Sequence, residues 1–324
     1  MNRRTFVTAA AAIVALPASG EAQRPGHSAH IGVLSFGAPE PFREGFRQAL
    51  LERGYVAGRD ITIDHRWANG QSRLLPALAR ELVQQNVDVI VANTTPCIQA
   101  AQAATRTIPI VMATAGDALG TRLVSKLSRP GGNTTGFSLA LIELAGKTVA
   151  LLHEAVPHMK TIACVVDRED VLHRGFLEQV ASSARRIGLR FRSFVLGSQA
   201  ELGAAIEEIG GDKFAGVIFQ PIFAVDPEVR ATIVRLTLEY RLPSVSGLAR
   251  FAEAGGFAAY SSEFSDLPKR VAVYVDKILK GAVPGELPVE QPTRFELVFN
   301  RKTAHALGLT IPPSLLLRAD SVID

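Results

Sequence analysis

The sequence predicts an α/β protein made of two doubly wound parallel-sheet lobes, joined by several crossing segments that act as a hinge. Three observations support this fold class. The chain has 324 residues and 47% hydrophobic content, which is enough for two domains with cores of their own. Short apolar runs rich in β-branched residues alternate with helical patterns, as buried parallel strands and their crossover helices do. The alternation stops near the middle of the chain and starts again, so each half forms one series of βα units.

The first half contains the clearest strand pattern. Val87–Ala92 and Ile108–Ala113 are continuous apolar runs that are too short for helices, and small polar residues follow each of them. Alternation, apolar stripes and stop signals indicate the remaining elements. We expect strands at His30–Ser35 and, near a sheet edge, Asp60–Arg66, helices at Pro41–Arg53 and from Ser72 onward, and a short extended crossing at Thr134–Ser138.

The second half repeats this architecture and then adds elements to both lobes. We expect helices at Ile142–Ala155, Gly175–Ile187, Glu201–Ile209, Pro227–Tyr240, Phe264–Lys280 and Lys302–Leu307, and strands at Thr161–Asp167, Arg190–Val195, Gly216–Phe219, Pro243–Val245, Gly255–Ser261 and Glu296–Asn300. The chain is expected to cross between lobes near 135–138, 248–256 and 287–293. The first lobe would then comprise residues 29–137 plus about 255–285, and the second lobe 138–254 plus about 290–324.

The N-terminus has the layout of an export signal. Met1–Gln23 has a basic start, an apolar run and small residues before a cleavage position near Ala22, which predicts a periplasmic protein whose signal covers residues 1–22. The pair Arg3-Arg4 resembles a twin-arginine signal, and the general secretory route stays open. No apolar run reaches the length of a membrane span. We expect Cys97 and Cys164 to lie in different lobes and to remain unpaired.

Charge and motifs exclude several function classes. The formal net charge is only +4, and Lys and Arg are scattered, so the footprint of a nucleic-acid-binding surface is missing. The histidines show no metal-binding spacing, and no glycine-rich phosphate loop follows a strand, so we expect no metal and no cofactor. Gly136-Phe137-Ser138-Leu139-Ala140 lacks the last glycine of a nucleophile elbow. These features predict a protein that is not an enzyme.

Polar residues at the ends of the predicted strands indicate a ligand-binding edge. Ligands of open α/β sheets bind at the carboxyl ends of strands, where helix N-termini also present free N–H groups. The candidate contacts share this position: Ser35, Phe36, Asn93, Thr94, Thr95, Asp117 and Ser138 in the first half, and Asp167, Gln220, Ser246 and Tyr260 in the second. Hydroxyl, amide and N–H groups would hold a carboxylate, Asp117 would pair with an ammonium, and Phe36 and Tyr260 would stack on the ligand. For Thr95 and Asp117, a role in a turn or cap is equally open.

Long phrases of the sequence carry a family resemblance. They occur in a fixed order over nearly all of the chain after the signal, at Ser35–Gly37, Glu52–Gly70, Val87–Pro96, Thr107–Asp117, Ser128–Ser138, Glu143–Pro157, Phe251–Ser261 and Ile278–Asp324. In these phrases the chain resembles the ABC-transporter substrate-binding proteins of the tryptophan/tyrosine-type family. The resemblance implies a type I periplasmic-binding-protein fold and a cleft between two hinged lobes.

The resemblance also implies a function. The protein would capture a small polar ligand, either an amino acid or an aromatic or carboxylate compound, and deliver it to an ABC permease in the inner membrane. We expect a monomer that does not itself span the membrane. Two alternatives remain open, namely a periplasmic ligand sensor for a membrane receptor and an exported α/β enzyme.

Overall fold

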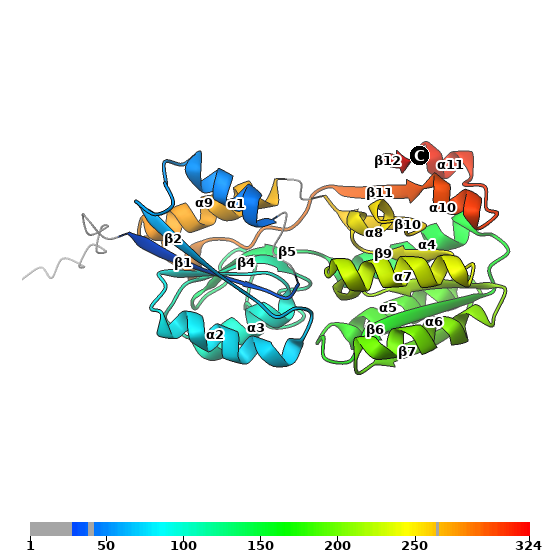
Figure 1. The fold of residues 1–324 in the computed structure, drawn as a ribbon, viewed down its shortest axis with the longest axis horizontal. Helices are drawn as coiled ribbons and strands as arrows, with labels where there is room; N and C mark the ends of the chain where they lie inside the picture. Colours follow the sequence, from blue (N-terminus) through cyan, green and yellow to red (C-terminus); the bar gives the residue numbers. More distant parts are fainter. Residues whose placement is uncertain (1–27, 38–41, 264–265) are drawn as a thin grey trace, which may run out of the picture.

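The molecule consists of two lobes, each built around its own β-sheet, which lie side by side in the computed structural model (Figure 1). The structure describes residues 28–37, 42–263 and 266–324. The expected export signal therefore lies outside the described residues. The predicted fold class is confirmed, because each lobe has a mostly parallel sheet covered by helices on both faces.

The first lobe has a five-stranded parallel sheet in the order β2-β1-β3-β4-β5. Its strands are β1 (Ala29–Ser35), β2 (Ile61–Trp67), β3 (Val89–Ala92), β4 (Ile110–Ala115) and β5 (Thr134–Ser138). Its helices are α1 (Phe42–Leu51), α2 (Leu75–Gln84), α3 (Thr95–Ala104) and α9 (Leu267–Leu279), with a 3-10 turn η1 (Ser72–Leu74) before α2 and another, η4 (Pro284–Glu286), after α9. The predicted crossing at Thr134–Ser138 is thus the fifth strand of this sheet.

The helices of the first lobe cover both faces of its sheet because their apolar stripes match the two faces of the strands. Phe46 of α1 and Val275 of α9 share one apolar cluster with Val33 of β1. Leu82 of α2 packs with Ile90 of β3 in a second cluster. Helix α9 therefore returns to the first lobe after the chain has built most of the second.

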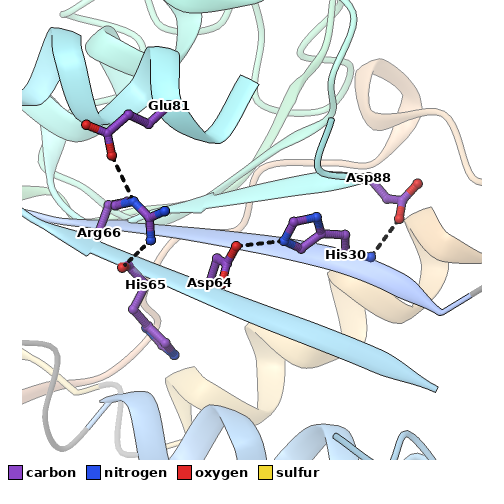
Figure 2. A network of polar contacts seen from close by, with 6 residues as sticks. All are labelled: His30, Asp64, His65, Arg66, Glu81 and Asp88. Carbon is purple, nitrogen blue, oxygen red and sulfur yellow. Dashed lines mark hydrogen bonds and ion pairs between the residues drawn. The ribbon is translucent and has the colours of Figure 1, made fainter. Parts of the chain in front are cut away.

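Strand β2 forms the predicted edge of the first sheet and carries polar side chains along it. His30 Nε2 lies 2.9 Å from a carboxylate oxygen of Asp64, while the His30 backbone N–H donates to Asp88 over 2.7 Å (Figure 2). On the same strand, Arg66 Nε donates to Glu81 of α2 over 3.0 Å. Charged side chains on an edge strand discourage pairing with a strand of another molecule.

The second lobe has a seven-stranded sheet in the order β12-β11-β10-β9-β8-β6-β7, in which only β10 and β11 pair antiparallel among the described strands. Its strands are β6 (Thr161–Asp167), β7 (Arg190–Leu196), β8 (Ala215–Phe219), β9 (Ser244–Ser246), β10 (Ala258–Ser262), β11 (Phe295–Asn300) and β12 (Ser321–Ile323). Its helices are α4 (Leu141–Ala155), α5 (His173–Arg186), α6 (Leu202–Gly210), α7 (Pro227–Glu239), α8 (Ala249–Glu253), α10 (Arg301–Ala306) and α11 (Pro313–Leu316), with 3-10 turns η2 (Gln199–Glu201) and η3 (Pro221–Ala224).

Two apolar clusters cover the faces of the second sheet. Val149 of α4 and Phe176 of α5 pack with Cys164 on one face. Ile206 of α6 and Phe219 of β8 belong to the other cluster, which continues without interruption into the α2–α3 face of the first lobe. Apolar packing is therefore continuous from one lobe to the other.

Three segments connect the lobes: β5 to α4, β10 to α9, and η4 to β11. The third segment runs beside the first. The Glu290 N–H donates to the Gly136 carbonyl over 2.9 Å, and the Ser138 N–H donates to the Glu290 carbonyl over 2.9 Å. Several parallel connections of this kind are the usual construction of a hinge between two lobes.

The structure corrects part of the predicted division into lobes. The sequence places about 255–285 in the first lobe and a crossing near 248–256. Strand β10 instead pairs with β9 and β11, so it belongs to the second sheet, and the crossing follows Ser262. Only α9 of this stretch packs on the first lobe, and the predicted start of that helix at Phe264 lies outside the described residues. The sequence could not show this, because a short apolar strand has the same residue pattern in either sheet and its pairing partners are distant in sequence.

Candidate ligand-binding site

A cavity of about 430 Å³ lies between the two lobes. It is lined by the residues that follow β1, β3 and β4 of the first sheet and β6, β8 and β9 of the second. Both sheets therefore present the carboxyl ends of their parallel strands to one space. This is the position at which ligands bind in open α/β sheets, and the volume is in the usual range for a small molecule.

The first-lobe wall is made of neutral polar groups. Ser35 ends β1, and Asn93 follows β3, and the Asn93 Nδ2 donates to the Ser35 Oγ over 3.2 Å. Thr95 begins α3, and its buried hydroxyl accepts a hydrogen bond from the Gly116 N–H over 3.0 Å. These bonds join the ends of β1, β3 and β4, and so fix the polar groups of this wall before a ligand arrives.

Thr94 has a backbone conformation that a β-branched residue rarely adopts. Its φ is 75° and its ψ is 153°, a region that is essentially restricted to glycine. The Thr94 N–H donates to the Thr114 Oγ1 over 3.0 Å, and the Thr94 hydroxyl lies 3.5 Å from the Cys97 Sγ. The strained turn brings Thr94 to the cavity just before the N-terminus of α3, where free N–H groups and the helix dipole favour a negatively polarised group.

The second-lobe wall contains a buried carboxylate, Asp170, held by neutral donors. The Gln220 Nε2 donates to Asp170 Oδ2 over 2.8 Å, and the Leu172 N–H donates to Oδ1 over 3.0 Å. Gln220 is itself fixed, because its Oε1 accepts from the Asp167 N–H over 2.9 Å. Burial raises the pKa of Asp170 to about 6, and the nearby charge of Asp167 adds to that rise.

Further acidic groups occupy the β10–β11 side of the same wall. Glu253, Glu263 and Glu296 line the cavity there, together with Arg250. The Ser261 hydroxyl donates to Glu296 Oε1 over 2.8 Å. Burial raises the pKa of Glu296, and the charges of Glu263 and Glu253 contribute to the rise.

Apolar side chains from both lobes form the rest of the lining. Phe36 and Phe42 contribute from the first lobe, and Leu172, Phe176 and Ile222 from the second. Phenyl rings and branched aliphatic chains favour a ligand with an apolar body in addition to its polar ends.

The structure brings together part of the predicted site. The predicted residues that line the cavity are Ser35, Phe36, Asn93, Thr94, Thr95 and Gln220. The predicted residues that do not line it are Asp117, Ser138, Asp167, Ser246 and Tyr260.

Of the five residues outside the lining, three accept hydrogen bonds from nearby backbone N–H groups, and the other two are Ser246 and Tyr260. Asp117 Oδ1 accepts from the Gly120 N–H over 2.8 Å, and Ser138 Oγ accepts from the Ala118 N–H over 3.0 Å. Asp167 Oδ1 accepts from the Glu169 N–H over 2.9 Å. Ser246 is fully buried, and the Tyr260 ring lies 6.1 Å from that of Phe295, centroid to centroid. Asp117 and Ser138 thus fix the turn after β4.

Sequence reasoning missed the acidic residues of the second wall. Asp170 belongs to the loop after β6, which contains three carboxylates and so could have indicated an acidic site. The strand pattern predicts Asp167 as the ligand contact instead, because Asp167 is the last residue of the strand. Glu296 lies near the start of β11, and this amino end reaches the cavity because β11 runs antiparallel to β10. No local pattern in the sequence reveals that reversal.

Cys97 and Cys164 are free, buried and in different lobes, as predicted. In the described ranges, no group of three or more His, Cys, Asp or Glu side chains could hold a metal ion. Within the same ranges, every helix is too short or too polar to cross a membrane.

The sequence profile of the family described as "ABC transporter substrate binding protein" matches residues 31–323. The chain belongs to this family. Its members are solute-binding proteins, which agrees with a cavity between two hinged lobes. The curated "Tyrosine-binding protein" of Clostridioides difficile (strain R20291) is 25% identical over 267 residues, which cover 82% of this chain and 76% of that protein.

Solved structures of similar proteins agree with the family assignment. A conserved domain protein from Vibrio cholerae is 28% identical with a TM-score of 0.84, over 91% of this chain and all (100%) of that one. The ABC domain from Streptococcus pneumoniae, solved in complex with L-Trp, is 27% identical with a TM-score of 0.81, over 92% of this chain and 100% of that chain. This substrate-binding protein therefore has the type I periplasmic-binding-protein fold that the resemblance implies.

Proposed function

We propose that this protein is the periplasmic solute-binding component of an ABC importer. It captures a small polar ligand in the interlobe cavity and delivers it to a permease in the inner membrane. The observation that carries the proposal is the cavity itself, because the strand ends of both sheets converge on it in a chain of this family. The L-Trp complex and the tyrosine-binding relative support an amino acid as the first ligand class to test.

The ligand contacts proposed from the first lobe are Ser35, Phe36, Asn93, Thr94 and Thr95, and from the second lobe Gln220. A ligand that touches both walls binds the closed arrangement more tightly than an open one, and so shifts the population toward closure. A micromolar ligand has a binding free energy of about 8 kcal/mol, which is ample for a preference of a few kcal/mol. Closure would present the permease with one defined surface.

Direct binding measurements test the solute-binding role. The purified protein is titrated by calorimetry with amino acids, aromatic acids, sugars and dicarboxylates. We expect one chemical class to bind, and Asn93→Ala to weaken that binding about tenfold because its amide lies at the cavity wall. Asp117→Asn is the matched control, since Asp117 lies outside the lining, and its affinity should stay unchanged. Equal losses in both variants would contradict the proposed site.

Uptake by cells tests delivery to a permease. A strain that lacks this chain should lose high-affinity uptake of the solute found by calorimetry, and the wild-type gene should restore it. Unchanged uptake would contradict the import role and would favour the sensor alternative. Amino-terminal sequencing of the protein from a periplasmic extract tests export, with a start near residue 23 as the expected result.

A further inference from the structure

The two walls of the cavity differ in charge. Within the described part of the chain, the first-lobe lining has no ionisable side chain; it consists of hydroxyl, amide, glycine, proline and apolar groups. The second-lobe lining contains the carboxylates of Asp170, Glu253, Glu263 and Glu296, and the guanidinium of Arg250. Among the described lining residues, every ionisable side chain therefore lies on the second-lobe side of the cavity.

Asp170 is the most buried of these carboxylates, with 4% of its surface exposed. Among the described residues, both hydrogen bonds to its carboxylate come from uncharged donors, the Gln220 amide and the Leu172 N–H, while His173 contacts its backbone carbonyl. In the ranges that the structure describes, no Lys or Arg forms an ion pair with it. A buried carboxylate without a cationic partner is costly, and a cation that enters the cavity would compensate it.

Glu296 adds to the negative potential on the other side of the same wall. Its hydrogen bond comes from the neutral Ser261 hydroxyl, and the charges of Glu263 and Glu253 lie close enough to oppose its ionisation. Beside it, the hydroxyl oxygen of Ser262 is buried and has no hydrogen-bond partner among the described residues. This side of the wall therefore repels anions and offers an additional polar contact to a ligand.

The apolar lining restricts the kind of cation. The rings of Phe36, Phe42 and Phe176 border the same cavity. Aromatic faces attract organic cations and pack against apolar bodies, whereas a hydrated inorganic ion gains little from them.

We propose that the ligand is an organic cation, with an apolar body and a net positive charge, whose ammonium nitrogen binds the carboxylate of Asp170. This inference rests on the proposed solute-binding function and names its ligand class. Glu253 and Glu296 strengthen the selection against anions. The N–H and hydroxyl groups of the first-lobe wall can bind a carboxylate of the ligand, but among its described lining residues this wall has no cation, so the ammonium contributes more to affinity than a carboxylate does.

Matched compounds that differ only in charge test the ligand class. Calorimetry at pH 7.5 compares tryptamine, L-tryptophan and indole-3-propionate, and then phenethylamine, L-phenylalanine and 3-phenylpropionate. For at least one ring we expect the amine to bind no more weakly than the amino acid, and at least about tenfold more tightly than the carboxylate. An amine that binds more weakly than its amino acid for both rings, or no binding by either amine, would overturn the inference.

Matched variants test the role of Asp170. Asp170→Asn should weaken binding of the amine at least about tenfold, because a buried charge-assisted hydrogen bond is lost. Asp167→Asn is the control: this acid lies on the same loop but not at the cavity, so it should change affinity by less than about twofold. Circular dichroism and thermal melts verify folding.

A second variant keeps the proposal testable if Asp170→Asn does not fold. Glu296→Gln should weaken amine binding about threefold and leave binding of an uncharged ligand unchanged. Equal affinity of wild type, Asp170→Asn and Glu296→Gln for the amine would contradict the inference.

The two proposals fail in different ways. If the wider solute panel yields a neutral or anionic ligand and the amines do not bind, the charge inference is wrong and the solute-binding function stands. If no solute binds in either panel, both are contradicted.

Discussion

The two walls of the interlobe cavity occupy the same topological position but have different chemistry. The first-lobe wall follows β1, β3 and β4 and is neutral, with groups that bond to one another, such as Asn93 to Ser35. The second-lobe wall follows β6, β8 and β9 and is acidic, with Asp170 held by Gln220. Position is therefore set by sheet topology, whereas charge is set by single side chains, Asp170 in the loop after β6, Glu253 at the end of α8 and Glu296 on β11.

Each wall also contains one feature that destabilises the folded protein. In the first lobe this feature is the strained backbone of Thr94, whose φ is 75°. In the second lobe it is the buried carboxylate of Asp170. A cationic group of a ligand would compensate the buried charge, whereas the backbone strain depends on no ligand, so substitutions in the two walls should differ in how their effect on stability depends on pH.

The largest expected effect concerns pH and the second wall. Burial raises the pKa of Asp170 to about 6 from the usual value of 3.8, so the folded state binds this proton more tightly than the unfolded state. Its contribution to stability is present below pH 4 and is lost as pH rises through about 6, a difference of about 3 kcal/mol. We expect the unfolding free energy of the ligand-free protein, relative to Asp170→Asn, to fall between pH 4 and pH 7.5 in urea melts.

The charged neighbours of Asp170 define the control for this pH effect. They are Asp167, which raises the pKa of Asp170, and His173, which lowers it. His173→Gln should retain most of the pH dependence. A wild-type curve parallel to that of Asp170→Asn would contradict the assignment.

Gln220 should have the next largest effect. Gln220→Leu leaves both the Asp167 N–H and the Asp170 carboxylate without their amide partner, so we expect it to lower the unfolding free energy by about 2 kcal/mol. Asn93→Leu removes one half-buried hydrogen bond in the first wall, and it should lower the unfolding free energy by less than about 1 kcal/mol. Urea melts of the two variants compare the walls directly, and equal losses would remove the distinction.

A smaller effect of opposite sign is expected at Thr94. Thr94→Gly relieves the positive φ at the start of α3, so the unfolding free energy should rise by about 1 kcal/mol while ligand affinity falls. Thr105→Gly, at the other end of the same helix, replaces a residue whose φ is −145° and whose hydroxyl accepts two backbone N–H groups. This control should lose stability. A loss of stability in Thr94→Gly would show that its backbone is not strained.

The smallest effect is expected from the thiols, of which each lobe contains one. Burial raises the pKa of Cys97 to about 12 and also raises the pKa of Cys164. Neither should react with a thiol reagent at pH 8 in the folded protein, and both should react in denaturant. Rapid labelling of only one of them would show that its lobe opens locally more often than the other.

Much of the fold follows from local sequence patterns. Continuous apolar runs such as Val89–Ala92 predict buried parallel strands, because both faces of such strands are covered by helices. The neutral wall was predictable for the same reason, since Asn93 and Thr95 immediately follow a recognisable strand.

The remaining features depend on contacts between distant segments. Strand β10 has the same apolar pattern whichever sheet it joins, and its pairing with β9 and β11 decides the lobe. Asp167 and Asp170 are three residues apart on one loop, and only the folded turn shows which of them reaches the cavity. Glu296 enters the site through the antiparallel direction of β11. The spacing of residues in the sequence shows neither the pairing of a strand nor the direction in which it runs.

A crystal structure with the tightest-binding amine tests the central claim most directly. The ligand should lie between the lobes with its ammonium nitrogen within about 3 Å of an Asp170 carboxylate oxygen and its apolar body against Phe36 or Phe176. A ligand seated elsewhere, or one whose ammonium points to the neutral first-lobe wall and away from Asp170, would contradict the account.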